Sequence, residues 1–169
     1  MKIHGELSVG KKKYHKGDDL PAKFVYPFFL LHMGLFGLSG FLMAYASNGP
    51  GLGFLYAHGG LAILVYLLFY LTIFGLDEVR WMFINAALGL FGIYAQIGWI
   101  LSWFGKSADH YAASRHAVPF LYYVLYTFLL YQMVLDLAHA RNDPVRRRRV
   151  ETVYVLTSLA VYGLIFWRL

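Results

Sequence analysis

Residues 81–104 read WMFINAALGLFGIYAQIGWILSWF and contain no charged side chain. As an α-helix, about 24 residues would reach roughly 36 Å, enough to cross a bilayer core of about 30 Å. The small and polar residues of this segment recur at helical spacing and form one stripe: Asn85, Gly89, Gly92, Gln96, Trp99 and Trp103. Because glycines permit close helix contacts and amides can hydrogen-bond across them, we expect this segment to be the hub of a helix bundle.

The composition of the whole chain indicates an integral membrane protein. Only 14% of the 169 residues are charged and 59% are hydrophobic, whereas an average soluble domain is about 25% charged. The charges are nearly missing from five long apolar segments, at residues 24–46, 52–75, 81–104, 117–138 and 150–167, which contain only Asp136 and Glu151. We therefore expect an all-α fold, with a solvated basic tail at residues 1–22 and a single bundle of five transmembrane helices at residues 23–169.

The cations are distributed unevenly between the two sides of such a bundle. With five spans, the N-terminal tail shares one side with the loops near residues 78 and 143. That side carries every Lys and Arg of the chain except Lys106, Arg115 and Arg168. The positive-inside rule then predicts a cytoplasmic N-terminus and an outer C-terminus in a cytoplasmic-type membrane.

The same rule explains the net charge of +6 without a nucleic-acid partner. Arg146, Arg147, Arg148 and Arg149 form the densest basic run, and topology alone accounts for it. The alternative for this run is binding of a lipid headgroup or of a partner subunit.

Ionisable and amide side chains inside the predicted helices indicate where chemistry could occur. An imidazole is costly within a bilayer unless it has a partner or a task, so intramembrane histidines are candidates by default. A neighbouring hydroxyl, amide or carbonyl that satisfies the ring is the structural alternative for each histidine. The candidate cofactor-binding residues are His32, His58, Gln96, His116, Asp136 and His139.

Three kinds of site compete for these residues. Haem b needs two imidazoles at similar depth, but His58 with His116 and His32 with His139 each differ by about 10 Å. A pigment, or a haem shared with another chain, would need only one histidine.

A quinone or proton site could combine His32 with Asp136 or Gln132, or His58 with Gln96. A metal site could use Asp109, His110 and His116, although these lie on a predicted loop without helical spacing.

The sequence contains no phosphate-binding glycine loop, no G-x-S-x-G and no H-E-x-x-H, so we do not expect catalysis by this chain alone. Its layout is similar to the membrane-anchor subunits of respiratory and photosynthetic complexes, a likeness of architecture that transfers no residues. We predict a membrane-embedded scaffold or anchor subunit of a larger electron-transferring complex, with other membrane subunits as partners and a haem, pigment or quinone site. The alternatives are a stand-alone haem-b redox protein and a small-solute channel or transporter.

Overall fold

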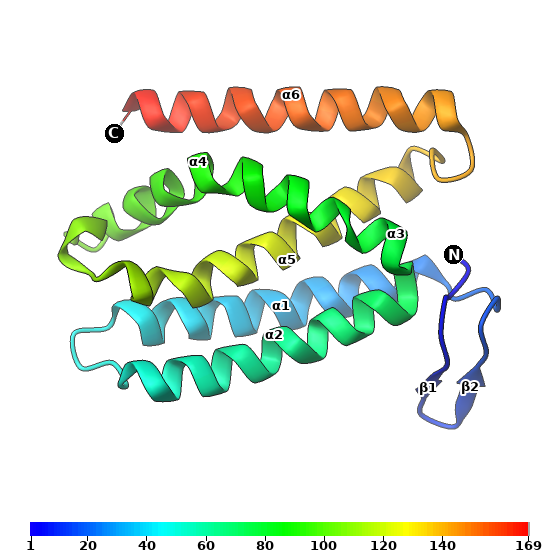
Figure 1. Ribbon diagram of the computed structural model, residues 1–169, viewed down its shortest axis with the longest axis horizontal. Coiled ribbons are helices and arrows are strands. Elements are labelled where there is room, and N and C mark those ends of the chain that lie inside the picture. Colours follow the sequence, from blue (N-terminus) through cyan, green and yellow to red (C-terminus); the bar gives the residue numbers. More distant parts are fainter. Residues whose placement is uncertain (169) are drawn as a thin grey trace.

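The computed structural model describes residues 1–168, apart from the side chains of Phe24, Phe91 and Arg168. Its long helices run along one axis, with a small hairpin at one end (Figure 1). The helices are α1 (Ala22–Tyr45), α2 (Leu52–Phe74), α3 (Leu76–Val79), α4 (Trp81–Ser102), α5 (Ala113–Leu137) and α6 (Pro144–Arg168). A short 3-10 helix, η1 (Ala108–His110), precedes α5, and two strands, β1 (Leu7–Val9) and β2 (Lys12–Tyr14), precede α1.

Local sequence signals explain where several helices begin and end. Gly75 ends α2 with a φ of 84°, a left-handed conformation that glycine adopts without strain. Asp143 accepts hydrogen bonds from the backbone N–H groups of Val145 and Arg146, both at 3.0 Å, and so caps the start of α6. Pro144 follows at the first helical position, where a missing N–H costs little.

Four helices, α1, α2, α5 and α6, are long and apolar enough to cross a membrane. A fifth crossing is available if α3 and α4 form one bent span, in which Leu76–Leu90 and Gly92–Ser102 differ in direction by 57°. The third predicted helix is therefore not straight. Gly89 and Gly92 lie beside the bend and present no side chains of their own toward the rings of α5 and α6.

The central helix is α5, so the prediction that residues 81–104 form the hub is wrong. Helix α5 contacts α1, α2, α4 and α6, and 61% of its apolar span is buried, compared with none of α6. Figure 1 shows α5 between the α1–α2 pair and α4, with α6 on the outside. The stripe on α4 indicates one packing face, whereas α5 presents large aromatic side chains to several neighbours at once.

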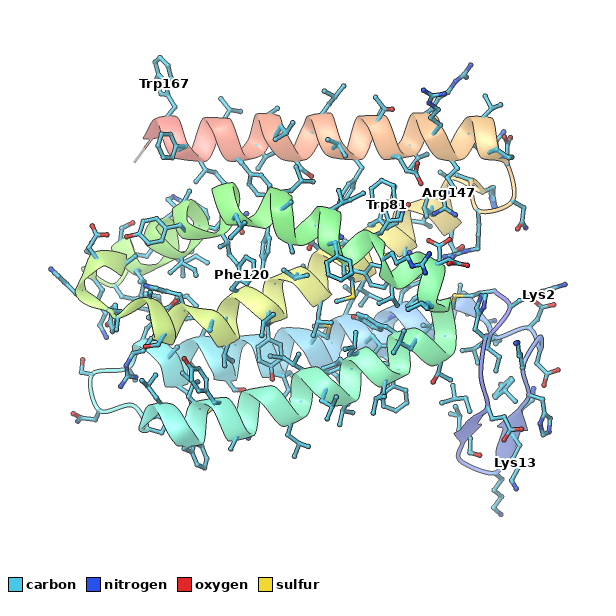
Figure 2. The ribbon with its side chains drawn as sticks, viewed as in Figure 1. Lys2, Lys13, Trp81, Phe120, Arg147 and Trp167 are labelled. Carbon is cyan, nitrogen blue, oxygen red and sulfur yellow. The ribbon has the colours of Figure 1, made fainter. Side chains whose placement is uncertain are left out.

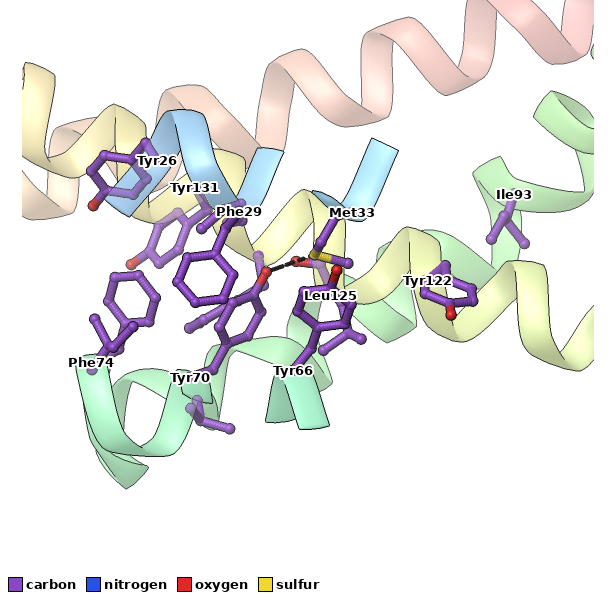
Figure 3. Close-up of a cluster of buried hydrophobic side chains, with 14 of the residues drawn as sticks. Tyr26, Phe29, Met33, Tyr66, Tyr70, Phe74, Ile93, Tyr122, Leu125 and Tyr131 are labelled. Atoms are coloured by element: carbon purple, nitrogen blue, oxygen red, sulfur yellow. Dashed lines mark hydrogen bonds between the residues drawn. The ribbon is translucent and has the colours of Figure 1, made fainter. Parts of the chain in front are cut away.

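Aromatic side chains fill the core where α1, α2 and α5 meet (Figure 3). Tyr70, Phe74 and Phe128 are fully buried, and their ring centroids lie 5.2 to 5.7 Å apart. The Tyr70 hydroxyl donates to the Leu125 carbonyl at 3.3 Å and to the Met33 sulfur at 2.8 Å. This buried phenol therefore joins the three helices as well as filling space.

The N-terminal tail is folded, which differs from the solvated tail expected from its lysines. Strands β1 and β2 pair antiparallel, and Ile3 and Leu20 are buried at the end of the bundle. The backbone N–H groups of His4 and Gly5 donate to the Thr72 carbonyl at 2.8 and 3.0 Å. Lys2 and Lys13 lie on this hairpin away from the helices (Figure 2). The lysines thus remain solvated while the apolar residues between them anchor the hairpin.

Candidate functional site

Two of the candidate histidines line the same cavity. This cavity, here called the α1–α2 groove, has a volume of about 360 Å³ and lies between α1 and α2. Its walls are aromatic and aliphatic, and they include Phe28, Phe29, His32, Phe36, His58 and Tyr66. From the sequence, we expect His32 to pair with Asp136 or Gln132 and His58 to pair with Gln96, so the groove that the two histidines share is a result of the tertiary structure.

The imidazole of His32 is oriented by its own helix. Its Nδ1 lies 2.8 Å from the Phe28 carbonyl, and its ring centroid lies 4.1 Å from the Phe28 ring. Because a carbonyl can only accept, Nδ1 carries the hydrogen in this bond, and Nε2 of the neutral ring is left as an acceptor. His32 is therefore a fixed imidazole whose second nitrogen is available to a ligand.

The His58 ring stacks on Phe54, with centroids 6.0 Å apart and planes 2° apart. Among the described residues, no hydrogen bond is made by either of its ring nitrogens. The Phe36 ring lies 6.2 Å from the His58 ring, and Phe36 is one helical turn from His32 on α1. Helices α1 and α2 are antiparallel, and Phe29 contacts Tyr66 and Phe69, so His58 lies beyond Phe36 from His32. The two histidines are therefore offset by roughly 10 Å along the helix axes.

His116 lies in a different environment at the opposite end of the bundle from the hairpin. Its Nδ1 lies 2.6 Å from the Tyr45 hydroxyl, and the Tyr94 ring meets it edge-on. Tyr94 in turn donates a hydrogen bond to Asp109. Within the described part of the chain, no three or more His, Asp or Glu side chains are gathered as they would be around a metal ion, and this includes Asp109, His110 and His116.

The remaining candidates are dispersed. His139 ends α5 with a φ of 49° and is exposed, which is typical of a helix C-cap. Across residues 1–168, no hydrogen bond or ring contact joins His58 to His116 or His32 to His139. Gln96 lines a second groove, between α4, α5 and α6, and does not lie with His58.

Asp136 is part of a partly buried ion pair with Arg141, and no hydrogen bond or ring contact among the described residues joins it to His32. Arg141 Nε donates to an Asp136 carboxylate oxygen at 2.6 Å, and Tyr26 of α1 donates to the other oxygen. The Tyr26 hydroxyl also lies 3.0 Å from the Gln132 carbonyl. These contacts tie the end of α5 to the start of α1.

A second ion pair lies beside it and was not anticipated. Arg147 of α6 donates to both carboxylate oxygens of Glu78, at 2.6 and 3.0 Å, and to Glu151 at 2.7 Å. Gln132 donates to Glu78 at 3.0 Å, and Tyr131 donates to Glu151 at 2.9 Å. Figure 2 shows Arg147 directed from α6 toward the bundle. The inner polar cluster comprises Tyr26, Glu78, Tyr131, Gln132, Asp136, Arg141, Arg147 and Glu151.

The sequence indicates one contact of this cluster but not the others. Arg147 and Glu151 are four residues apart, a spacing at which side chains meet on a helix. Nothing in the sequence indicates that Glu78, in a turn 69 residues away, completes the pair. The chain matches no protein-family model, no curated protein and no solved structure.

Proposed function

We propose that this protein is a multi-pass subunit of a larger electron-transferring complex in a cytoplasmic-type membrane, and that its α1–α2 groove is a quinone site. The observation that supports this proposal is the presence of two imidazoles, His32 and His58, in one aromatic groove. A quinone site needs polar groups near the ring and apolar walls around it.

Placement in a bilayer is supported by the side chains on the outside of the bundle. Large aliphatic side chains are exposed on every long helix, such as Leu61 on α2 at 65% and Leu164 on α6 at 67%. Lipid can cover such a surface, whereas water would make it an aggregation site. The distribution of Lys and Arg favours five spans with the hairpin on the cytoplasmic side.

The geometry of the groove favours a quinone over a haem held by this chain. Two imidazoles separated by roughly 10 Å are too far apart to ligate one iron. They can instead face the two opposed carbonyls of one ring, each through a hydrogen bond of about 2.8 Å. The rings of Phe28, Phe36 and Tyr66 supply flat apolar surface for the quinone ring.

His32 is suited to exchange a proton with such a ligand. Oxidation of a quinol to a quinone releases two protons and two electrons. Nε2 of His32 can accept one proton and a ring nitrogen of His58 the other, and both can be returned when a quinone is reduced. The two electrons would be exchanged with a redox group on another subunit of the complex. In this scheme the chain supplies the binding pocket and the two proton acceptors.

The experiment is to measure quinone bound to the gently solubilised protein, by solvent extraction and by titration with a short-tailed quinone. We expect the wild-type chain to bind one quinone, and His32→Leu and His58→Leu to weaken binding at least tenfold. The matched control is His139→Leu, which changes a histidine outside the groove and should leave binding unchanged.

A reduced-minus-oxidised spectrum of the same samples tests the competing proposal. A haem band that follows the isolated chain and disappears in His32→Leu would replace the quinone proposal with the haem alternative. Absence of quinone binding in the wild type, or equal binding in all three variants, would reject the site.

A further inference from the structure

A larger cavity follows the inner side of α6. The α6 groove has a volume of about 720 Å³ and lies between α4, α5 and α6. One stripe of α6 lines it, at Arg149, Val150, Val153, Tyr154, Thr157, Ser158, Val161 and Tyr162. The opposite wall includes Tyr126, Leu130 and Val134 of α5. Arg149 and Tyr162 are 13 residues apart, so the groove extends for roughly 20 Å.

The two ends of the α6 groove differ in character. At the far end, Tyr123 and Tyr162 are hydrogen-bonded to each other, and the Tyr162 ring packs on Gly92 of α4. These contacts join α6 to α4 and α5 beyond the cavity. At the near end, Arg149 lines the groove beside Val134 and Val150. The groove is therefore apolar along its length and cationic at one mouth.

The four consecutive arginines at this mouth fall into two pairs. Arg146 lies 3.9 Å from Asp143, and Arg147 is held by Glu78 and Glu151. Arg148 and Arg149 are exposed, and neither guanidinium has an ion pair or hydrogen bond with another described residue. Both lie on an open surface formed by residues of α6 alone, which shares Arg149 and Val153 with the α6 groove. Arg149 thus lines the entrance, and Arg148 lies next to it with a second uncompensated positive charge.

We propose that the α6 groove binds one anionic phospholipid, with its phosphate at Arg148 and Arg149 and an acyl chain between α5 and α6. Charge complementarity accounts for the headgroup, because free guanidinium groups beside an apolar helix attract anionic lipid. The apolar walls of the groove account for the binding of the acyl chain. The inference requires that the protein lies in a bilayer, as proposed above, but does not depend on the quinone site.

The test is native mass spectrometry of the full chain in detergent, titrated with phosphatidylglycerol or with phosphatidylcholine of the same acyl composition. We expect one phosphatidylglycerol to be retained in preference to phosphatidylcholine. Neutralisation of Arg148 and Arg149 together should reduce this preference by about 25-fold, or about fivefold for each charge. Replacement of Lys11, Lys12 and Lys13 by Gln removes more charge from the distant hairpin and should leave the preference unchanged.

A second pair of variants tests whether the groove is needed for lipid binding while both arginines are kept. Ser158→Phe fills the groove and leaves both arginines, so it should remove the retained lipid. Leu159→Phe makes a similar change on the exposed side of α6 and should not. Thr157→Phe repeats the obstruction if the Ser158 variant is poorly folded. Unchanged lipid preference in the obstructed variants, or an equal loss in the hairpin variant, would overturn the proposal.

Discussion

At the hairpin end of the bundle, several charged side chains are largely buried and form ion pairs that hold the structure together. The side chains of Glu78 and Arg147 are only 15% and 26% exposed, and their bidentate contact lies between α3 and α6. Arg141 is similarly placed beside Asp136. Burial lowers the pKa of Arg141, but the hydrogen bond and charge of Asp136 outweigh this effect and raise the pKa above its usual value. Arg141 therefore keeps its charge at any pH at which the protein is handled.

Loss of one partner of the Glu78–Arg147 pair should destabilise the bundle. We expect Arg147→Gln to lower the free energy of unfolding by about 2 kcal/mol, because it leaves two largely buried carboxylates without their cation. The neighbouring Arg148→Gln removes the same charge from an exposed, unpaired site and should change stability by less than about 0.5 kcal/mol. Unfolding in mixed micelles with increasing denaturing detergent measures both. Equal effects of the two substitutions would mean that the Glu78 contact contributes nothing.

At the scale of elements, helix α6 packs mainly on α4, and one glycine is central to this contact. A Cβ atom at Gly92 would lie 2.3 Å from the Tyr162 ring, which is too close for the two helices to keep their positions. Tyr162 is also bonded to Tyr123 of α5. Because residue 92 has no side chain, the Tyr162 ring of α6 can pack directly on the backbone of α4.

The prediction is that Gly92→Ala loosens α6. We expect a loss of about 1–3 kcal/mol, the range for overpacking in a close-packed interface. Gly163→Ala is the matched control, because a Cβ there has open space and alanine favours helix. The measurement is the free energy of unfolding of both variants. The double variant Gly92→Ala/Tyr162→Ala removes the ring that the new Cβ atom would meet, so it tests whether the loss comes from this contact. Wild-type stability of Gly92→Ala would show that α6 does not depend on this contact.

At the scale of the whole molecule, the two ends of the bundle differ in charge. The hairpin, α3, the inner polar cluster and the basic start of α6 lie at one end, and the α1–α2 and α4–α5 connections lie at the other (Figure 1). An end rich in cations should remain on the cytoplasmic side during insertion. The same end also contains the buried ion pairs that fasten the helices.

The chain has no cysteine, so single cysteines can report its orientation directly. We expect Asn48→Cys, between α1 and α2, to react with a membrane-impermeant thiol reagent on intact cells. Asn142→Cys, between α5 and α6, should react only after permeabilisation. Both positions are exposed asparagines in connections, which makes them a matched pair. The opposite pattern would invert the proposed topology, and labelling of both from outside would mean that α3 and α4 do not form a fifth span.

The sequence by itself determined the all-α class and the existence of several helices long and apolar enough to cross a membrane. These properties depend on residues close together in the chain: uncharged runs of sufficient length, separated by Gly, Pro, Asn and Asp. The sequence also identified the first half of the packing stripe of α4, since Asn85, Gly89 and Gly92 are buried, whereas Trp99 and Trp103 of the same stripe are 43% and 65% exposed.

Only the tertiary structure decided which helix is central, which charges are paired and which histidines share a groove. A stripe shows that a face is buried but not which neighbour covers it, and an arginine run does not show that Arg147 reaches Glu78 while Arg148 stays free. His32 and His58 line one groove because α1 and α2 pack side by side, a relation between residues 26 positions apart that no local pattern contains. Packing between distant segments sets these features, and it depends on all the side chains at once.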